Sequence, residues 1–223
     1  GERKGVNILL SGPSGTGKTM MAKAVGNRLN KEVYRLSMSD MINCWYGETE
    51  KNVARMFDLV ESKDGIVLFD EADGILNQRG GRNNSSTDST ENRMVNLILQ
   101  RLEEHSGIII MTTNVASKID SALERRIDLK IKFPMPDVEA RRKIWEYHIP
   151  EELPLAEGVD LDRLARKYEF SGGQIRNAIV NAARHSLMNE SDVVSQEDIE
   201  IACKREDMGE KAMDYHLEDD RRQ

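Results

Sequence analysis

Short apolar segments rich in β-branched residues alternate with longer amphipathic segments through the first part of the chain. The short segments predict strands at Val6–Ser11, Glu32–Ser37, Gly65–Phe69, Gly107–Thr112 and Leu129–Phe133. The third and fourth are apolar at nearly every position, which is typical of strands buried on both faces of a parallel sheet. The longer segments predict helices at Lys18–Asn30, Glu48–Val60 and Thr90–Glu103. This alternation predicts an α/β fold around a parallel five-stranded sheet.

The pattern changes at Pro134 and Pro136, which end the last predicted strand because proline cannot propagate regular structure. Beyond this point the sequence predicts helices alone, at Asp137–His148, Leu161–Tyr168, Gly172–Asn189 and Ser195–Arg205. Ser195 and Asp198 are spaced as a capping box at the start of the last helix. The expected domains are therefore an α/β core over 1–136, an all-helical domain over 137–206 and a charged tail over 207–223.

Composition narrows the range of functions. The 223 residues include 32 Lys and Arg against 39 Asp and Glu, a net charge of −7 that argues against a dedicated nucleic-acid binder. The two cysteines and four histidines have no metal-ligand spacing, and two reduced thiols fit a cytoplasmic protein. No apolar segment approaches the length of a membrane span.

A phosphate-binding motif lies between the first predicted strand and the first predicted helix. It reads Gly12-Pro13-Ser14-Gly15-Thr16-Gly17-Lys18-Thr19, a complete Walker A sequence in the expected context. Backbone N–H groups from this loop to Met20 are expected to surround the phosphates of ATP. Lys18 supplies positive charge to the β- and γ-phosphates, and the hydroxyl of Thr19 is a ligand for Mg²⁺.

Two adjacent acidic residues follow the third predicted strand and complete a Walker B motif. Asp70 lies at the carboxyl end of that buried strand, where it is placed to hold Mg²⁺. Glu71 is placed to polarise the attacking water. The two motifs together predict a P-loop protein that binds and hydrolyses ATP with Mg²⁺.

With these motifs, several further segments resemble the AAA+ ATPases, and among them the classical AAA clade of protein-remodelling ATPases of the katanin, spastin and FtsH type. Thr112-Thr113-Asn114 resembles sensor 1, which implies that Asn114 senses the γ-phosphate. Ile119–Asp128 resembles the second region of homology, which implies that Arg125 and Arg126 reach the ATP of a neighbouring subunit. Many members have Pro-Gly between these two arginines; here they are adjacent, and Arg126 is favoured.

The resemblance extends to the sensor 2 region and the pore loops. Gly172 and Gly173 align with sensor 2, where small residues bring backbone close to the adenosine. Trp45, Tyr46 and Gly47 resemble the first pore loop, whose aromatic residue grips an extended polypeptide. Arg79–Thr90 corresponds to the second pore loop.

The resemblance implies a RecA-like α/β sandwich followed by a small helical lid, with ATP between them. It implies a hexameric ring that remodels, unfolds or disassembles protein substrates, and a module that begins before Gly1. Two alternatives remain open. A DNA-handling AAA+ ATPase, such as a helicase or clamp loader, would show DNA-stimulated hydrolysis, and a nucleotide-dependent scaffold would turn over little ATP.

Overall fold

The structure is a computed structural model that describes residues 5–36, 49–73, 96–115, 119 and 121–219. Its contacts divide the chain into two compact units. The first comprises Gly1–Pro13 and Gly17–Phe133, and the second comprises Ser14–Thr16 and Pro134–Gln223. The change from α/β to all-helical structure thus falls at the proline-containing segment where the sequence pattern changes.

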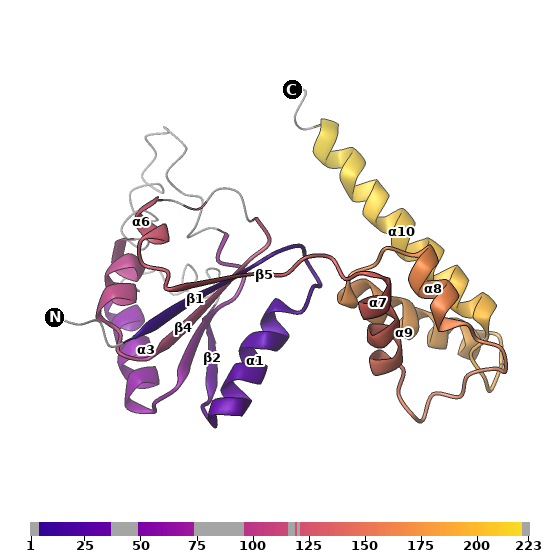
Figure 1. Cartoon of the computed structure of the whole chain (residues 1–223), viewed down its shortest axis with the longest axis horizontal. Coiled ribbons are helices and arrows are strands. Elements are labelled where there is room, and N and C mark those ends of the chain that lie inside the picture. Colours follow the sequence, from indigo (N-terminus) through magenta and orange to yellow (C-terminus); the bar gives the residue numbers. More distant parts are fainter. Residues whose placement is uncertain (1–4, 37–48, 74–95, 116–118, 120, 220–223) are drawn as a thin grey trace. The chain divides into compact units, whose positions relative to one another are not determined.

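The first unit is built on a parallel sheet with the strand order β2-β3-β4-β1-β5 (Figure 1). Its strands are β1 (Val6–Ser11), β2 (Val33–Leu36), β3 (Ile66–Phe69), β4 (Ile108–Thr113) and β5 (Leu129–Lys132). All four pairings between neighbouring strands are parallel. The structure therefore confirms the predicted fold class and the predicted number of strands.

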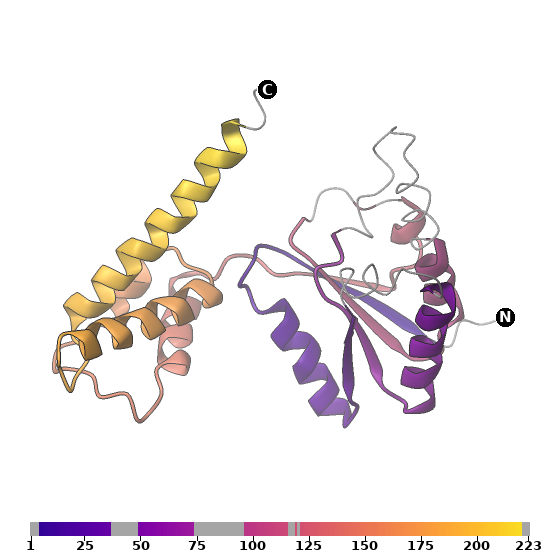
Figure 2. The same cartoon turned by 180° about the vertical axis from the view of Figure 1, so that it is seen from behind.

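Helices cover both faces of this sheet (Figures 1 and 2). Helix α1 (Lys18–Leu29) packs on one face, against Leu10, Leu68 and Ile110. Helix α3 (Thr49–Ser62) and the helical segment 96–104 pack on the other, against the alternate strand residues Leu9, Val67, Phe69, Ile109 and Met111. Successive residues of the central strands thus face opposite cores, which explains why β3 is entirely apolar and β4 is apolar from Ile108 to Met111.

The second unit contains α7 (Val138–His148), α8 (Leu161–Lys167), α9 (Gly172–Met188) and α10 (Gln196–Asp219). Trp145 is fully buried in its core, together with apolar residues of α8, α9 and α10. The N-cap residues of α7, α8 and α9 are Asp137, Asp160 and Ser171. Their side chains accept the backbone N–H groups of Ala140, Arg163 and Gln174, respectively. The helices therefore begin where the sequence supplies capping residues.

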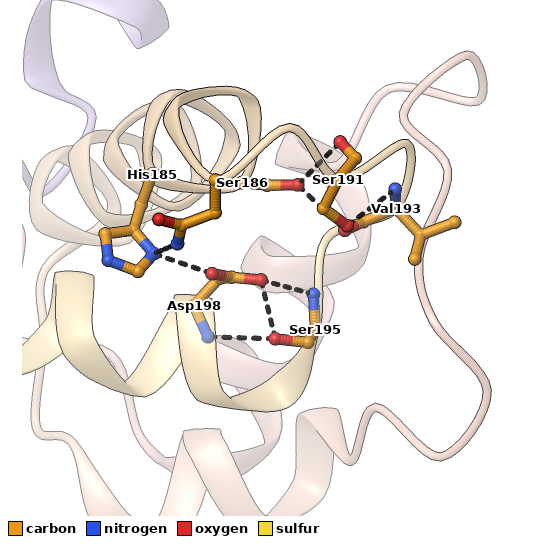
Figure 3. Close-up of polar contacts among 7 residues, drawn as sticks. His185, Ser186, Ser191, Val193, Ser195 and Asp198 are labelled. Carbon is orange, nitrogen blue, oxygen red and sulfur yellow. Dashed lines mark hydrogen bonds and ion pairs between the residues drawn. The ribbon is translucent and has the colours of Figure 1, made fainter.

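The capping box predicted for α10 is present and carries a third residue (Figure 3). The amide of Ser195 donates to Asp198 Oδ2 at 2.9 Å, and the amide of Asp198 donates to Ser195 Oγ at 3.2 Å. The other oxygen of Asp198 lies 2.6 Å from His185 Nδ1, near the end of α9. Serine contacts aspartate here rather than histidine, so the three residues join two helices and do not form a catalytic triad.

Two differences from the sequence-based expectations concern helices, one through the end of a helix and one through a helix that was not expected. We expected the last helix to end at Arg205 and a tail to follow, but α10 continues to Asp219. The added residues contain no proline and are mostly good helix formers, so nothing local stops the helix. The one-turn helix α6 (Ser121–Glu124) was not predicted, because four residues are too few for a periodic signal.

Candidate nucleotide-binding site

The Walker A segment forms the turn between β1 and α1. Gly12 has φ +150°, and a Cβ atom there would lie 2.0 Å from the carbonyl oxygen of Phe133. Gly17, the N-cap of α1, has φ +96° in the left-handed region. Both positions favour glycine, the first through the close approach of Phe133, which follows β5, and the second through backbone conformation. The turn therefore leads directly into the N-terminus of α1, a favourable place for phosphate.

Lys18 is the first residue of α1, and its side chain folds back over the turn. Nζ donates to the carbonyl oxygens of Gly12 and Pro13, each at 2.7 Å. Burial lowers the pKa of Lys18, and the carboxylates of Asp73, Asp70 and Glu71 act in the opposite direction. The ammonium group is thus held at the mouth of the turn, with the acidic residues of the site nearby.

The two residues that the sequence assigned to magnesium, Thr19 and Asp70, are in contact. Asp70 follows β3 directly and is 7% exposed. Thr19 Oγ1 donates to Asp70 Oδ1 at 2.9 Å, although 51 positions separate the two residues. A carboxylate and a hydroxyl oxygen are donors that Mg²⁺ accepts, in a site completed by nucleotide phosphates and water. The donor set of Thr19 and Asp70 therefore fits this ion.

Thr112, at the end of β4, connects both acidic residues of the Walker B motif. Its Oγ1 donates to Asp70 Oδ1 at 2.7 Å and accepts the backbone N–H of Glu71 at 3.0 Å. Its carbonyl accepts the N–H of Ala72 at 2.8 Å. Glu71 is exposed and has φ +55°, which is uncommon for a residue other than glycine. The bonds from Thr112 support this backbone conformation beside the carboxylate of Asp70.

The predicted sensor 1 residue follows the same strand. Asn114 comes directly after β4 and is exposed. Its neighbour Thr113 is buried and hydrogen-bonds through Oγ1 to a carboxylate oxygen of Asp73. The ends of β3 and β4 thus place Asp70, Glu71 and Asn114 at one edge of the sheet.

The two candidate arginine fingers lie in different environments. Arg125 is exposed. The guanidinium of Arg126 forms an ion pair with Glu103 at 2.8 Å and donates to the carbonyl oxygen of Ala122 at 2.5 Å. Arg126 is therefore anchored within its own unit, by the helical segment 96–104 on one side and by α6 on the other.

A buried asparagine in β1 fixes the backbone of the segment that contains Arg126 and Asp128. Asn7 is 1% exposed, and its Nδ2 donates to the carbonyl oxygens of Leu102 and Arg126, each at 2.9 Å. Its amide N–H donates to Asp128 Oδ2 at 2.7 Å. Sequence reasoning missed Asn7, although an asparagine inside an apolar strand is a signal, since a buried amide requires partners.

The remaining predicted residues divide into described and undescribed positions. Met20 is 56% exposed on α1. Within the second compact unit, the amide of Gly173 donates to the carbonyl oxygen of Gly15 at 3.0 Å, and Gly172 is the first residue of α9. The expected pore-loop residues Trp45, Tyr46 and Gly47 lie outside the described residues, as does the segment 79–90.

A parallel sheet with a Walker A turn between β1 and α1, and an aspartate after β3 bonded to the motif's threonine, defines a P-loop nucleotide-binding protein. The sequence of residues 8–135 matches the model of the family "ATPase family associated with various cellular activities (AAA)". The chain belongs to this AAA family.

Relatives support the same assignment. The chain is 35% identical over 205 residues to the 26S proteasome regulatory subunit 8 homolog of Encephalitozoon cuniculi, covering 89% of this chain and 52% of the relative. It is 34% identical over 220 residues to the ATP-dependent zinc metalloprotease FtsH 2 of Salinibacter ruber, covering 96% and 32% respectively. It is 35% identical over 201 residues to the cell division cycle protein 48 homolog of Archaeoglobus fulgidus, covering 85% and 27%. The chain thus spans about half or less of each relative.

Among the described residues, no helix has both the length and the apolar character needed to cross a membrane.

Proposed function

We propose that this chain is an ATP-hydrolysing module of a protein-remodelling machine. The observation that carries the proposal is the convergence of Thr19 and Thr112 on one oxygen of Asp70, with Glu71 next in the chain. This arrangement joins the Walker A turn, the Walker B strand and the sensor 1 strand at one site. Family membership and the names of the relatives support the same function.

Each residue has a distinct part in hydrolysis. Lys18 places positive charge against the β- and γ-phosphates, and Thr19 with Asp70 holds Mg²⁺. When Mg²⁺ is bound, it neutralises negative charge on the phosphates. Glu71 accepts a hydrogen bond from the attacking water and polarises it, and Asn114 orients that water against the γ-phosphate.

We assign the substrate class as protein rather than DNA. The net charge of −7 opposes binding to a polyanion, and the relatives include proteasome regulatory subunits and FtsH-type proteases. Trp45, with Tyr46 and Gly47, is proposed to grip the polypeptide inside a hexameric ring. A cytoplasmic location accords with Cys203, which is a buried free cysteine. Burial raises the pKa of its thiol to about 12.

The arginines of the second region of homology are proposed to act on the nucleotide of a neighbouring subunit. Because Arg126 is paired with Glu103 and bonded to Ala122, the exposed Arg125 is the better placed of the two to reach another chain. On this ground we propose Arg125 as the residue that acts on the neighbour, although the sequence favoured Arg126. Arg126 then acts mainly by holding α6 and the arginine segment in position.

The substitution Glu71→Gln tests the hydrolytic assignment. It keeps the shape of the side chain and removes the carboxylate, so ATP is expected to bind but to turn over more slowly by about 100-fold or more, the size typical of general-base catalysis. ATP binding by calorimetry and phosphate release give the two readouts. Wild-type turnover in this variant would assign the base to another residue.

The substitution Trp45→Ala tests the choice of substrate. For a protein-remodelling module, basal ATP hydrolysis is expected to persist while unfolding of an added protein substrate is lost. For a DNA motor, the unmutated chain is expected instead to bind single strands tightly, with an affinity that falls steeply as salt rises.

A further inference from the structure

The Walker B aspartate forms an ion pair with an arginine on the neighbouring strand. Arg35 Nη2 lies 2.9 Å from Asp70 Oδ2. Strands β2 and β3 are parallel, with Arg35 opposite Leu68, and the amide of Asp70 donates to the carbonyl oxygen of Leu36 at 3.3 Å. The backbone register therefore brings the guanidinium to the carboxylate from the β2 edge of the sheet.

The two oxygens of Asp70 have different partners. Oδ1 accepts the neutral hydroxyls of Thr19 and Thr112, whereas Oδ2 faces the charged guanidinium of Arg35. Lys18, the other cation described near this carboxylate, directs its Nζ to the carbonyl oxygens of Gly12 and Pro13. Arg35 thus neutralises the oxygen of Asp70 that the threonines leave available.

The two partners also differ in exposure. The side chain of Asp70 is 7% exposed, while that of Arg35 is 61% exposed. This pair joins a buried carboxylate, held in place, to a side chain that is mostly in solvent. It therefore differs from a surface ion pair, in which both partners move freely. Arg35 can leave the carboxylate for water at little cost, whereas Asp70 cannot follow it.

From these contacts we infer that Arg35 sets the magnesium affinity of the site by competing with Mg²⁺ for Asp70 Oδ2. This inference rests on the proposed function, because it concerns the same metal. Mg²⁺ is held in such sites by one or two carboxylates and by nucleotide phosphates, so the availability of one carboxylate has a large effect. A guanidinium at Oδ2 both occupies a ligand position and repels the divalent ion. Binding of Mg²⁺–nucleotide therefore requires Arg35 to swing away from Asp70.

The experiment measures binding rather than turnover. Calorimetry gives the affinity of the chain for ADP in EDTA and across a Mg²⁺ titration, for wild type, Arg35→Met and Arg35→Lys. Methionine keeps much of the side-chain length without charge, and lysine keeps the charge. Arg28→Met removes an exposed arginine from the last turn of α1 and is the control for net charge.

In the Mg²⁺ titration, ADP affinity rises with Mg²⁺, and the midpoint is the Mg²⁺ concentration at which half of this rise has occurred. Arg35→Met is expected to lower the midpoint by about threefold to tenfold, because it removes a positive charge that repels the ion across a partly screened distance. Arg35→Lys is expected to lie nearer to wild type, and Arg28→Met to match it. Affinity in EDTA is expected to change less than about twofold, since Asp70 acts through the metal. Unchanged or weaker Mg²⁺ dependence in Arg35→Met would overturn the inference on Arg35 alone. Absence of ADP binding by wild type would overturn the proposed function and this inference with it.

Discussion

Asp70 and Thr112 are joined by a hydrogen bond of 2.7 Å between the ends of neighbouring strands, and the same hydroxyl accepts the N–H of Glu71. One side chain therefore contacts both the carboxylate proposed to hold the metal and the backbone of the residue proposed to polarise the water.

Thr112→Val removes this hydroxyl and keeps the shape of a buried side chain. We expect kcat to fall by about tenfold or more, because a lost hydrogen bond to a charged group is worth about 1.5–3 kcal/mol. Nucleotide affinity in EDTA is expected to change little, since Lys18 and the Walker A turn remain. Thr112→Ser retains the hydroxyl and is expected to keep most of the activity. A Thr112→Val variant with normal turnover would show that Asp70 and Glu71 do not depend on this contact.

Lys18→Ala is expected to weaken ATP binding by at least tenfold, since a hydrogen bond to a charged group contributes about 1.5–3 kcal/mol. Lys23→Ala, an exposed lysine on the same helix, is the matched control and is expected to bind ATP normally. Calorimetry measures both, and thermal unfolding shows whether loss of the contacts to Gly12 and Pro13 has altered the fold. Equal affinity in the two variants would contradict the P-loop assignment.

Arg125→Ala and Arg126→Ala are expected to differ. The first should spare ATP binding and stability but lower turnover in the assembled state, because its side chain is exposed. The second should also lower the free energy of unfolding, because it removes the contacts to Glu103 and Ala122.

Mixed assemblies test action between subunits. An Arg125→Ala subunit has a complete ATP pocket, and a Glu71→Gln subunit supplies an intact arginine. Hydrolysis should therefore return when the two variants are mixed and shown to assemble together. If mixing restores nothing, the arginine does not act on a neighbour's nucleotide.

Stability of the first unit is expected to fall below pH 6.5 because of His105. Its side chain is 1% exposed, against the ring of Phe57 and 3.7 Å from Glu61. Burial lowers the pKa of His105; Glu61 acts to raise it and Arg101 to lower it. At a pH above the pKa of an unfolded histidine, about 6.5, His105 is neutral in both the folded and the unfolded chain. Below this pKa the unfolded chain takes up a proton that the folded chain does not, so stability falls as pH falls.

The variant His105→Gln isolates this contribution. Its free energy of unfolding should decline less than that of wild type between pH 7.5 and 5.5, with a limiting difference of about 1.4 kcal/mol per pH unit. His148 in the second unit has a pKa lowered by burial and by Arg176, which gives a decline of the same sign in both proteins. Parallel declines in the two proteins would mean that His105 titrates alike when folded and unfolded.

The sequence by itself determined the fold class and the location of the proposed phosphate site. Alternating strand and helix patterns specify an α/β layer, and the Walker A turn is contiguous, so its chemistry is contained in one segment between β1 and α1. Capping residues such as Asp137 and Ser171 likewise act on amides only a few positions away. In each case the interacting groups are close in the chain, so their spacing carries the information.

Only the tertiary structure decided which distant side chains meet. Arg35 reaches Asp70 because β2 and β3 are neighbours in a fixed register, and Thr112 reaches both acidic residues because β4 lies beside β3. Asn7 holds the arginine segment across 119 positions of sequence. Strand order cannot be deduced from residue type and spacing alone. It depends on how the strands bury both faces of the sheet, and this packing is a property of the whole unit.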